Sequence, residues 1–202
     1  MIFVILVFQV SNARNIYKMR GHGMKLCSEN VREEIIGIVL ILIGVTLRVL
    51  PHEDNFTPVT AIALFSGVVL SPAVVLTVPL IVMIASDLLI GPHPLYGLTW
   101  GCFLLVSLMG LSMRRSPKAR NIFFGTLAGS VLFYGVTNLG VFLFQGMYPK
   151  NFQGFVECFV MALPFFRNSL LGDLFYTAVF FGLFAAAKNF SHERRSQEKN
   201  PA

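Results

Sequence analysis

The chain has 202 residues, of which 55% are hydrophobic and 13% are charged. A soluble domain usually carries about a quarter charged residues, so this composition excludes an ordinary soluble domain and indicates an integral membrane protein. The net charge of +6 lies mainly in the tails and in one connection between apolar runs. That distribution sets membrane orientation and does not favour a nucleic-acid-binding protein.

The first 34 residues precede the predicted membrane domain as an N-terminal extension. Residues 1–10 form an apolar run that is too short to span a bilayer and has no basic residues before it. Two interpretations stay open: a peripheral hydrophobic anchor, or an incorrectly assigned start in which Met24 is the true first residue. The second is preferred, because Met24 opens a short polar segment that leads into the first long apolar run.

Six apolar runs predict six transmembrane helices, since a spanning helix needs roughly 20 mostly apolar residues. The runs cover residues 35–50, 59–70, 73–90, 95–113, 122–145 and 169–187. Pro79 lies within the third run and is expected to kink that helix. The aromatic connection over residues 148–167 leaves open a short re-entrant or interfacial helix. The predicted fold is therefore an all-α integral membrane domain of six helices over residues 35–187, followed by a charged, frayed tail over residues 188–202.

Three segments are rich in Lys and Arg, and an arrangement of six helices puts all three on one side of the membrane. They precede the first helix, follow the fourth helix and form the C-terminal tail. Their basic residues are Lys25, Arg32, Arg114, Arg115, Lys118, Arg120, Lys188, Arg194, Arg195 and Lys199. The positive-inside rule assigns this side to the cytoplasm, so both termini are expected there. The outer connections then cover residues 51–57, 91–94 and 148–167.

Polar side chains within or beside the apolar runs gather toward the predicted outer side. They are Arg48, Asp87, Asn138, Arg167 and Asp173. Ionisable groups at membrane depth are costly unless they are paired or face a water-filled cavity, so these residues predict an outward-facing pocket. Two alternatives stay open: solvated helix ends, or a structural ion pair such as Arg48 with Asp87. Asp173, expected in the first turn of the sixth helix, could also serve only to complement the helix dipole.

Ala63 and Gly67 in the second helix are four residues apart, and later helices contain glycine pairs at the same spacing. Small residues at this spacing let helix backbones approach closely. The pattern leaves two interpretations open: packing within the bundle, or docking with another membrane protein.

The sequence contains no zinc-protease, serine-hydrolase, P-loop or dinucleotide-binding motif. We therefore do not expect an enzyme, nor a chain that itself hydrolyses ATP. Cys27, Cys102 and Cys158 are dispersed without ligand spacing, and His52 and His93 are loop histidines, which are more often solvated than metal-bound. No metal and no cofactor are expected.

Five stretches form a pattern that continues through most of the apolar region. They are RVLPH (48–52), NFTPVTAIALF (55–65), SD (86–87), VTN (136–138) and ALPFFRNSLLGDL (162–174). In this order they resemble a family of small, uncharacterised bacterial membrane proteins related to the substrate-binding (S) components of energy-coupling-factor (ECF) vitamin transporters. The resemblance covers residues 48–182, and residues 91–98 depart from the pattern.

The resemblance implies an ECF S-component-like bundle of six helices in the bacterial cytoplasmic (inner) membrane, with a ligand pocket closed by the three outer connections. It implies a substrate-binding subunit for uptake of a small, vitamin-like micronutrient. An ECF coupling protein and ATPase subunits would be the partners and would supply the missing P-loop. Ala63 and Gly67 are the candidate contact with the coupling protein. The candidate substrate-binding residues are Arg48, His52, Asn55, Asp87, Asn138, Arg167, Asn168 and Asp173.

Two other functions stay open. A non-transporting accessory or scaffold protein would bind other membrane proteins and would need no small-molecule ligand. An intramembrane enzyme would need Asp87 and Asp173 within hydrogen-bonding reach of one substrate atom.

Overall fold

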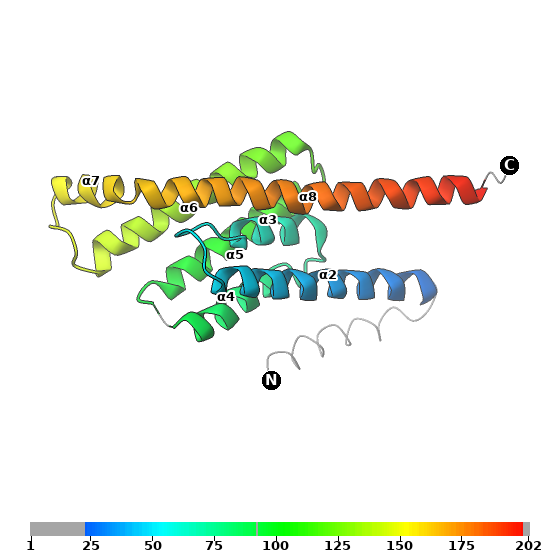
Figure 1. Cartoon of the computed structure of the whole chain (residues 1–202), viewed down its shortest axis with the longest axis horizontal. Helices are drawn as coiled ribbons and strands as arrows, with labels where there is room; N and C mark the ends of the chain where they lie inside the picture. The colour runs from blue at the N-terminus through cyan, green and yellow to red at the C-terminus, as the bar shows by residue number, and fades with distance from the viewer. Residues whose placement is uncertain (1–22, 92, 200–202) are drawn as a thin grey trace.

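The computed structural model describes residues 23–91 and 93–199, and all regular secondary structure in the described part is α-helix (Figure 1). Each of the six predicted runs corresponds to one helix, and α7 is a further short helix in the connection over residues 148–167. The helices are α2 (Gly23–Val49), α3 (Val59–Val69), α4 (Thr77–Ile90), α5 (Tyr96–Met113), α6 (Ala119–Phe144), α7 (Phe152–Met161) and α8 (Leu163–Lys199). The alternatives for residues 1–10 lie outside the described residues.

Three of these helices are long and apolar enough to cross a membrane: α5, α6 and the part of α8 up to Asn189. They indicate a membrane-associated, all-α protein. α3 and α4 are apolar but have 11 and 14 residues. Helices of this size cover about 17 and 21 Å, whereas the hydrocarbon core of a bilayer is about 30 Å thick. By length and composition together, three helices could cross a membrane, and six crossings remain a prediction.

α3 is the central helix of the bundle. Its residues from Val59 to Val68 are all buried, and it contacts α2, α4, α5, α6 and α8. A helix that is apolar around its whole circumference is stable when protein surrounds it on all sides. The short central helix is therefore enclosed by its neighbours.

α3 and α5 cross at close range at two glycines. A Cβ atom added to Gly67 would collide with the backbone carbonyl oxygen of Ser107, and one added to Gly110 would collide with that of Leu64. Ala63, on the same helix as Gly67, is fully buried. The small residues of α3 are therefore used for packing within the bundle, which is the first of the two interpretations above. A partner protein would have to dock elsewhere.

Aromatic side chains join α3 to α8. The ring of Phe65 contacts the rings of Phe180, Phe181 and Phe184, at centroid distances of 6.1, 5.0 and 5.7 Å. Aromatic pairs at these distances add stabilisation beyond the area that they bury. One side chain of the central helix thus fixes the middle of α8 against the core.

α8 is longer than predicted at both ends. It begins at Leu163 rather than near Ser169, and it continues to Lys199. Pro164 is compatible with this start, because N–H groups in the first turn of a helix have no partner within the helix. The helix thus includes most of the charged tail that was predicted to begin at residue 188. This segment is rich in Lys, Arg, Glu and Gln, which favour helix, and extending an existing helix requires no new nucleus.

α4 and α2 also differ from their predicted bounds. α4 begins at Thr77 rather than at residue 73, so Pro79 falls in its first turn. There the missing N–H breaks no helical hydrogen bond, and no kink is required. α2 begins at Gly23, so its polar first turns extend the apolar run that starts at residue 35.

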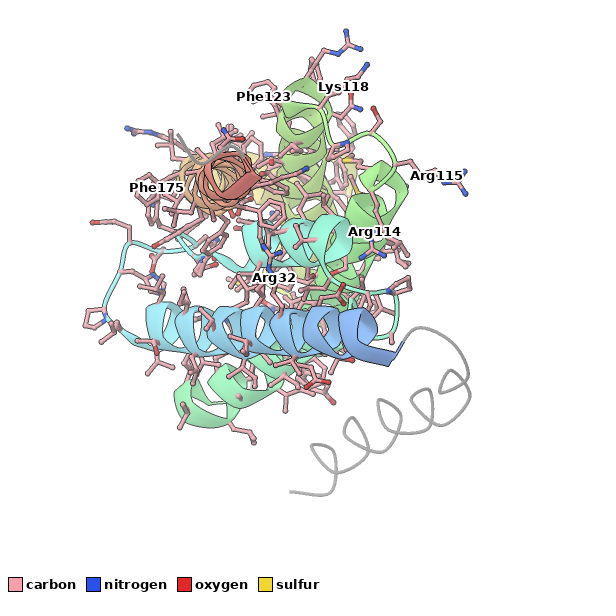
Figure 2. All side chains as sticks on the ribbon, turned by 90° about the vertical axis from the view of Figure 1, so that its right-hand side faces the viewer. Arg32, Arg114, Arg115, Lys118, Phe123 and Phe175 are labelled. Atoms are coloured by element: carbon pink, nitrogen blue, oxygen red, sulfur yellow. The ribbon has the colours of Figure 1, made fainter. Side chains whose placement is uncertain are left out.

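The two ends of the bundle differ in charge. Figure 1 shows the start of α2 and the end of α8 at one end, and Figure 2 looks onto that end, where Arg32, Arg114, Arg115 and Lys118 lie. We call it the basic end. Arg114 Nε donates a hydrogen bond to the carbonyl oxygen of Val68 at 3.3 Å, near the C-terminus of α3, where the helix dipole favours a cation.

Candidate functional site

A pocket of about 250 Å³ lies at the end of the bundle opposite the basic end. It is lined by the connections after α2 and α4, the start of α5, the second half of α6 and the start of α8. Its lining consists of Asn55, His93, Pro94, Leu95, Thr99, Phe133, Tyr134, Thr137, Asn138, Val141, Gln145, Ala162, Phe165, Phe166 and Ser169.

Helical periodicity explains most of this lining. Tyr134, Asn138, Val141 and Gln145 recur every three or four residues and so share one face of α6 and its C-terminal cap. The start of α8 presents a second such face over residues 162–169. The pocket therefore lies where these two helix faces diverge.

Internal contacts fix one wall of the pocket. The ring of Tyr134 lies 4.7 Å from that of Phe166 between centroids, and its hydroxyl donates to the carbonyl oxygen of Phe159 at 2.6 Å. Asn138 Nδ2 donates to the carbonyl oxygen of Tyr134 at 2.8 Å. Behind this wall, Cys158 Sγ donates to the carbonyl oxygen of Asn138 at 3.5 Å, and burial raises the pKa of the Cys158 thiol, which favours the protonated donor. The wall is thus ordered before any ligand arrives.

The lining mixes polar and apolar side chains and contains no Asp, Glu, Lys or Arg among the described residues. Amide, hydroxyl and imidazole groups can form hydrogen bonds with a ligand. They are supplied by Asn55, His93, Thr99, Tyr134, Thr137, Asn138, Gln145 and Ser169. Between them lie the apolar faces of Phe133, Phe165 and Phe166. This chemistry suits an uncharged molecule with a flat apolar body and a few polar edges.

Arg48 and Asp87 form a paired network beside the pocket. Arg48 Nη1 lies 2.5 Å from Asp87 Oδ1 and also donates to Ser86 Oγ at 2.5 Å. Trp100 Nε1 donates to the second oxygen of Asp87 at 2.8 Å, and His93 Nε2 lies 3.7 Å from that oxygen. Both carboxylate oxygens are therefore engaged, as the structural ion-pair alternative predicts. Of this network, His93 alone also lines the pocket.

Asp173 lies inside the bundle and is 2% exposed. A hydrogen bond of 2.6 Å joins its Oδ2 to Ser130 Oγ of α6. Because α8 begins at Leu163, Asp173 is well past the first turn, so complementing the helix dipole does not explain it. It follows Ser169 of the pocket lining by one helical turn on the same face. Asp173 therefore lies beneath the pocket rather than in it.

The other predicted binding residues divide between the pocket and the surface. Asn55 and Asn138 line the pocket, and Asn55 has a φ of 62°, a left-handed conformation that asparagine tolerates better than most residues. His52 is exposed and contacts the carbonyl oxygen of Glu53 in its own connection and that of Arg48 in the last turn of α2. Arg167 is exposed and Asn168 is partly buried, and neither belongs to the pocket lining.

The predicted set did not include Thr137, Ser169 or the aromatic walls. One available signal was the spacing of Tyr134, Asn138, Val141 and Gln145, which places three polar side chains on one helix face. The start of α8 gave no such signal, because residues 162–167 were expected to belong to the connection before the sixth helix, where only a short re-entrant or interfacial helix was left open.

Across residues 23–91 and 93–199, no group of three His, Cys, Asp or Glu side chains could hold a metal ion.

The chain matches a family described as a family of unknown function, DUF6580, over residues 28–196. No curated protein and no solved structure matches it.

Proposed function

The chain belongs to the DUF6580 family, whose function is unknown, and from that premise we propose that it is a membrane subunit that binds a small, uncharged, vitamin-like molecule for uptake. The observation that carries the proposal is the pocket of about 250 Å³ at one end of the bundle. Small-molecule sites are typically about 300–1,000 Å³, apolar for the most part, with a few placed polar groups. At about 250 Å³ this pocket lies just below that range, and it combines aromatic walls with polar groups that can orient a ligand.

The proposed ligand follows from the lining. A charged ligand would lose its hydration without gaining an opposite charge, because the described lining contains none from Asp, Glu, Lys or Arg. A planar ring system could stack on Phe133 and Phe166 while Asn138 hydrogen-bonds its edge. The hydrogen bond from Asn138 to Tyr134 uses one amide hydrogen, so the other hydrogen and the amide oxygen retain capacity for a ligand.

Orientation follows from the basic end of the bundle. By the positive-inside rule this end, which carries the start of α2 and the end of α8, faces the cytoplasm. The pocket then faces outward from the bacterial cytoplasmic membrane, where nutrients arrive. The chain carries no nucleotide-binding motif. We therefore propose that an ECF-type coupling protein with its ATPase subunits supplies the energy for transport.

The proposal is tested by thermal unfolding of the detergent-purified protein against a panel of vitamins and their precursors. A ligand that binds only the folded state stabilises it by about 2.7 kcal/mol at about a hundredfold excess over its Kd. We expect at least one uncharged aromatic compound to raise the unfolding temperature.

The pocket assignment is tested in the same assay with two matched variants of α6. Asn138→Ala removes an amide from the pocket, whereas Asn121→Ala removes an amide at the opposite end of the same helix, where it donates to Ser116. The stabilisation should be lost in Asn138→Ala and kept in Asn121→Ala. A flat panel with well-folded protein would refute the binding function and favour the scaffold alternative.

A further inference from the structure

The interior of the bundle holds a carboxyl group surrounded by hydroxyl groups. Asp173 of α8 is 2% exposed, and the buried side chains around it include Thr60 of α3 and Ser130 of α6. Next to them, Thr126 Oγ1 of α6 and Thr177 Oγ1 of α8 are 3.2 Å apart, and both residues are buried. Hydroxyl groups do not titrate in the physiological range, so Asp173 is the ionisable member of this cluster.

Among the described side chains, none with a positive charge forms an ion pair with this carboxyl group. The ion pairs among the described side chains, Arg48 with Asp87 and His93 with Asp87, do not include Asp173. A buried carboxylate without a counter-charge is strongly unfavourable, and such a group commonly takes up a proton instead. Its hydrogen-bond geometry gives a second, independent reason to place a proton there.

The second reason is a count of hydrogens. Ser130 Oγ lies 3.0 Å from the carbonyl oxygen of Thr126 and 2.6 Å from Asp173 Oδ2. A carbonyl oxygen only accepts, and a serine hydroxyl has a single hydrogen to donate. If that hydrogen is directed to Thr126, the 2.6 Å contact requires a hydrogen on Asp173. A neutral acid that donates to Ser130, which in turn donates to Thr126, satisfies both contacts.

We propose that Asp173 is a proton-binding site beneath the pocket and that its proton exchanges through the pocket. Two helix faces connect the two sites. Ser169 lines the pocket one turn before Asp173 on α8, and Tyr134 lines it one turn after Ser130 on α6. The proton site itself does not depend on the proposed function; only the exchange route uses the pocket.

The test is infrared spectroscopy of the full chain in lipid vesicles, which detects the carbonyl stretch of a protonated carboxyl group. Between about pH 5 and pH 8, the wild type should show this band, and Asp173→Asn should lose it. Asp54→Asn, in an exposed connection, should keep it. His93→Asn should also keep it, which separates Asp173 from the side chain that lines the pocket beside Asp87.

Ser130→Ala is the second test variant, to be used if Asp173→Asn fails to fold. It keeps the carboxyl group but removes its hydrogen-bond partner, so the band should persist and shift in frequency. Thr137→Trp fills the pocket and should slow the shift of the band after transfer into D₂O.

Four results would overturn the inference. They are a missing band in the wild type, a band unaffected by Asp173→Asn, a band unaffected by Ser130→Ala, and a band that appears only when Na⁺ is replaced by choline. The last would identify a sodium site. Exchange at an unchanged rate in Thr137→Trp would refute the route through the pocket. If no compound in the panel raises the unfolding temperature but the carboxyl band is present and lost in Asp173→Asn, the proposed function is refuted and the proton site is retained.

Discussion

Two buried aspartates give the bundle two polar centres, and their partners differ in kind. Asp87 has a cation, an indole N–H and a nearby imidazole as partners. Asp173 is hydrogen-bonded to a serine hydroxyl deep between α6 and α8. Asp87 is paired with a fixed cation, whereas the neighbours of Asp173 are hydroxyl groups. The two residues therefore belong to separate networks and have different expected roles.

Removing one partner of the Arg48–Asp87 pair should destabilise the fold. The paired atoms are 2.5 Å apart, and the side chains are 16% and 8% exposed. Either Arg48→Ala or Asp87→Ala leaves a buried charge without its partner. We expect each to lower the free energy of unfolding by about 3 kcal/mol, the low end for buried pairs, because Arg48 keeps some contact with solvent. Equilibrium unfolding in detergent measures this.

The double variant provides the control for that prediction. Arg48→Ala with Asp87→Ala should lose less than the sum of the single losses, because no charge remains unpaired. Arg115→Ala, at an exposed position, should change stability by less than about 0.5 kcal/mol. Strict additivity of the two single losses, or single losses below about 1 kcal/mol, would show that the pair is not structural.

The sequence could place Arg48, Asp87 and Asp173 in apolar surroundings, but it could not assign their partners. Burial follows from the hydropathy of the flanking residues. Partnership depends on how each helix is rotated about its axis and packed, which is a property of the whole bundle. The same limit explains why the pair Arg48–Asp87 was recognised only as an alternative.

At the scale of elements, the crossing of α3 and α5 carries a sharp prediction. A Cβ on Gly110 would collide with the backbone of α3, whereas a Cβ on Gly101 of the same helix would meet nothing within 4 Å. Gly110→Ala should therefore destabilise the fold by about 1–3 kcal/mol. Gly101→Ala should be neutral or stabilising by up to about 1 kcal/mol, because alanine favours helix. Thermal unfolding of both variants measures the difference, and equal effects would contradict the crossing.

Helix existence was predictable because each apolar run is long and bounded by polar residues, glycine or proline. Helix ends were not, and α8 shows why. Its early start depends on Pro164 being accommodated in a first turn, and its late end depends on charged residues that favour helix outside any apolar run. Hydropathy detects neither effect. Pro79 is a similar case: the sequence predicted it in a helix interior, whereas α4 begins later and Pro79 lies in its first turn.

At the scale of the whole molecule, the bundle has a basic end and a pocket end built around the short, enclosed helix α3. Asn138 was found in advance because a polar residue stands out in an apolar run, and Asn55 because it lies in a predicted outer connection. The aromatic walls could not be found that way, since phenylalanines are abundant along the chain and only packing decides which of them face a cavity. The uncharged character of the site follows only from the assembled lining.

The most direct test of the pocket is native mass spectrometry of the protein released from bacterial membranes in detergent. We expect the wild type to carry a small-molecule adduct that is lost in Thr137→Trp, where the larger side chain fills the pocket. Val131→Trp, at a position on the same helix that is 57% exposed, should keep the adduct. An adduct of equal occupancy in both variants would place the ligand elsewhere. A wild type without any adduct, even after incubation with the compound panel, would contradict the account of this protein as a binding subunit.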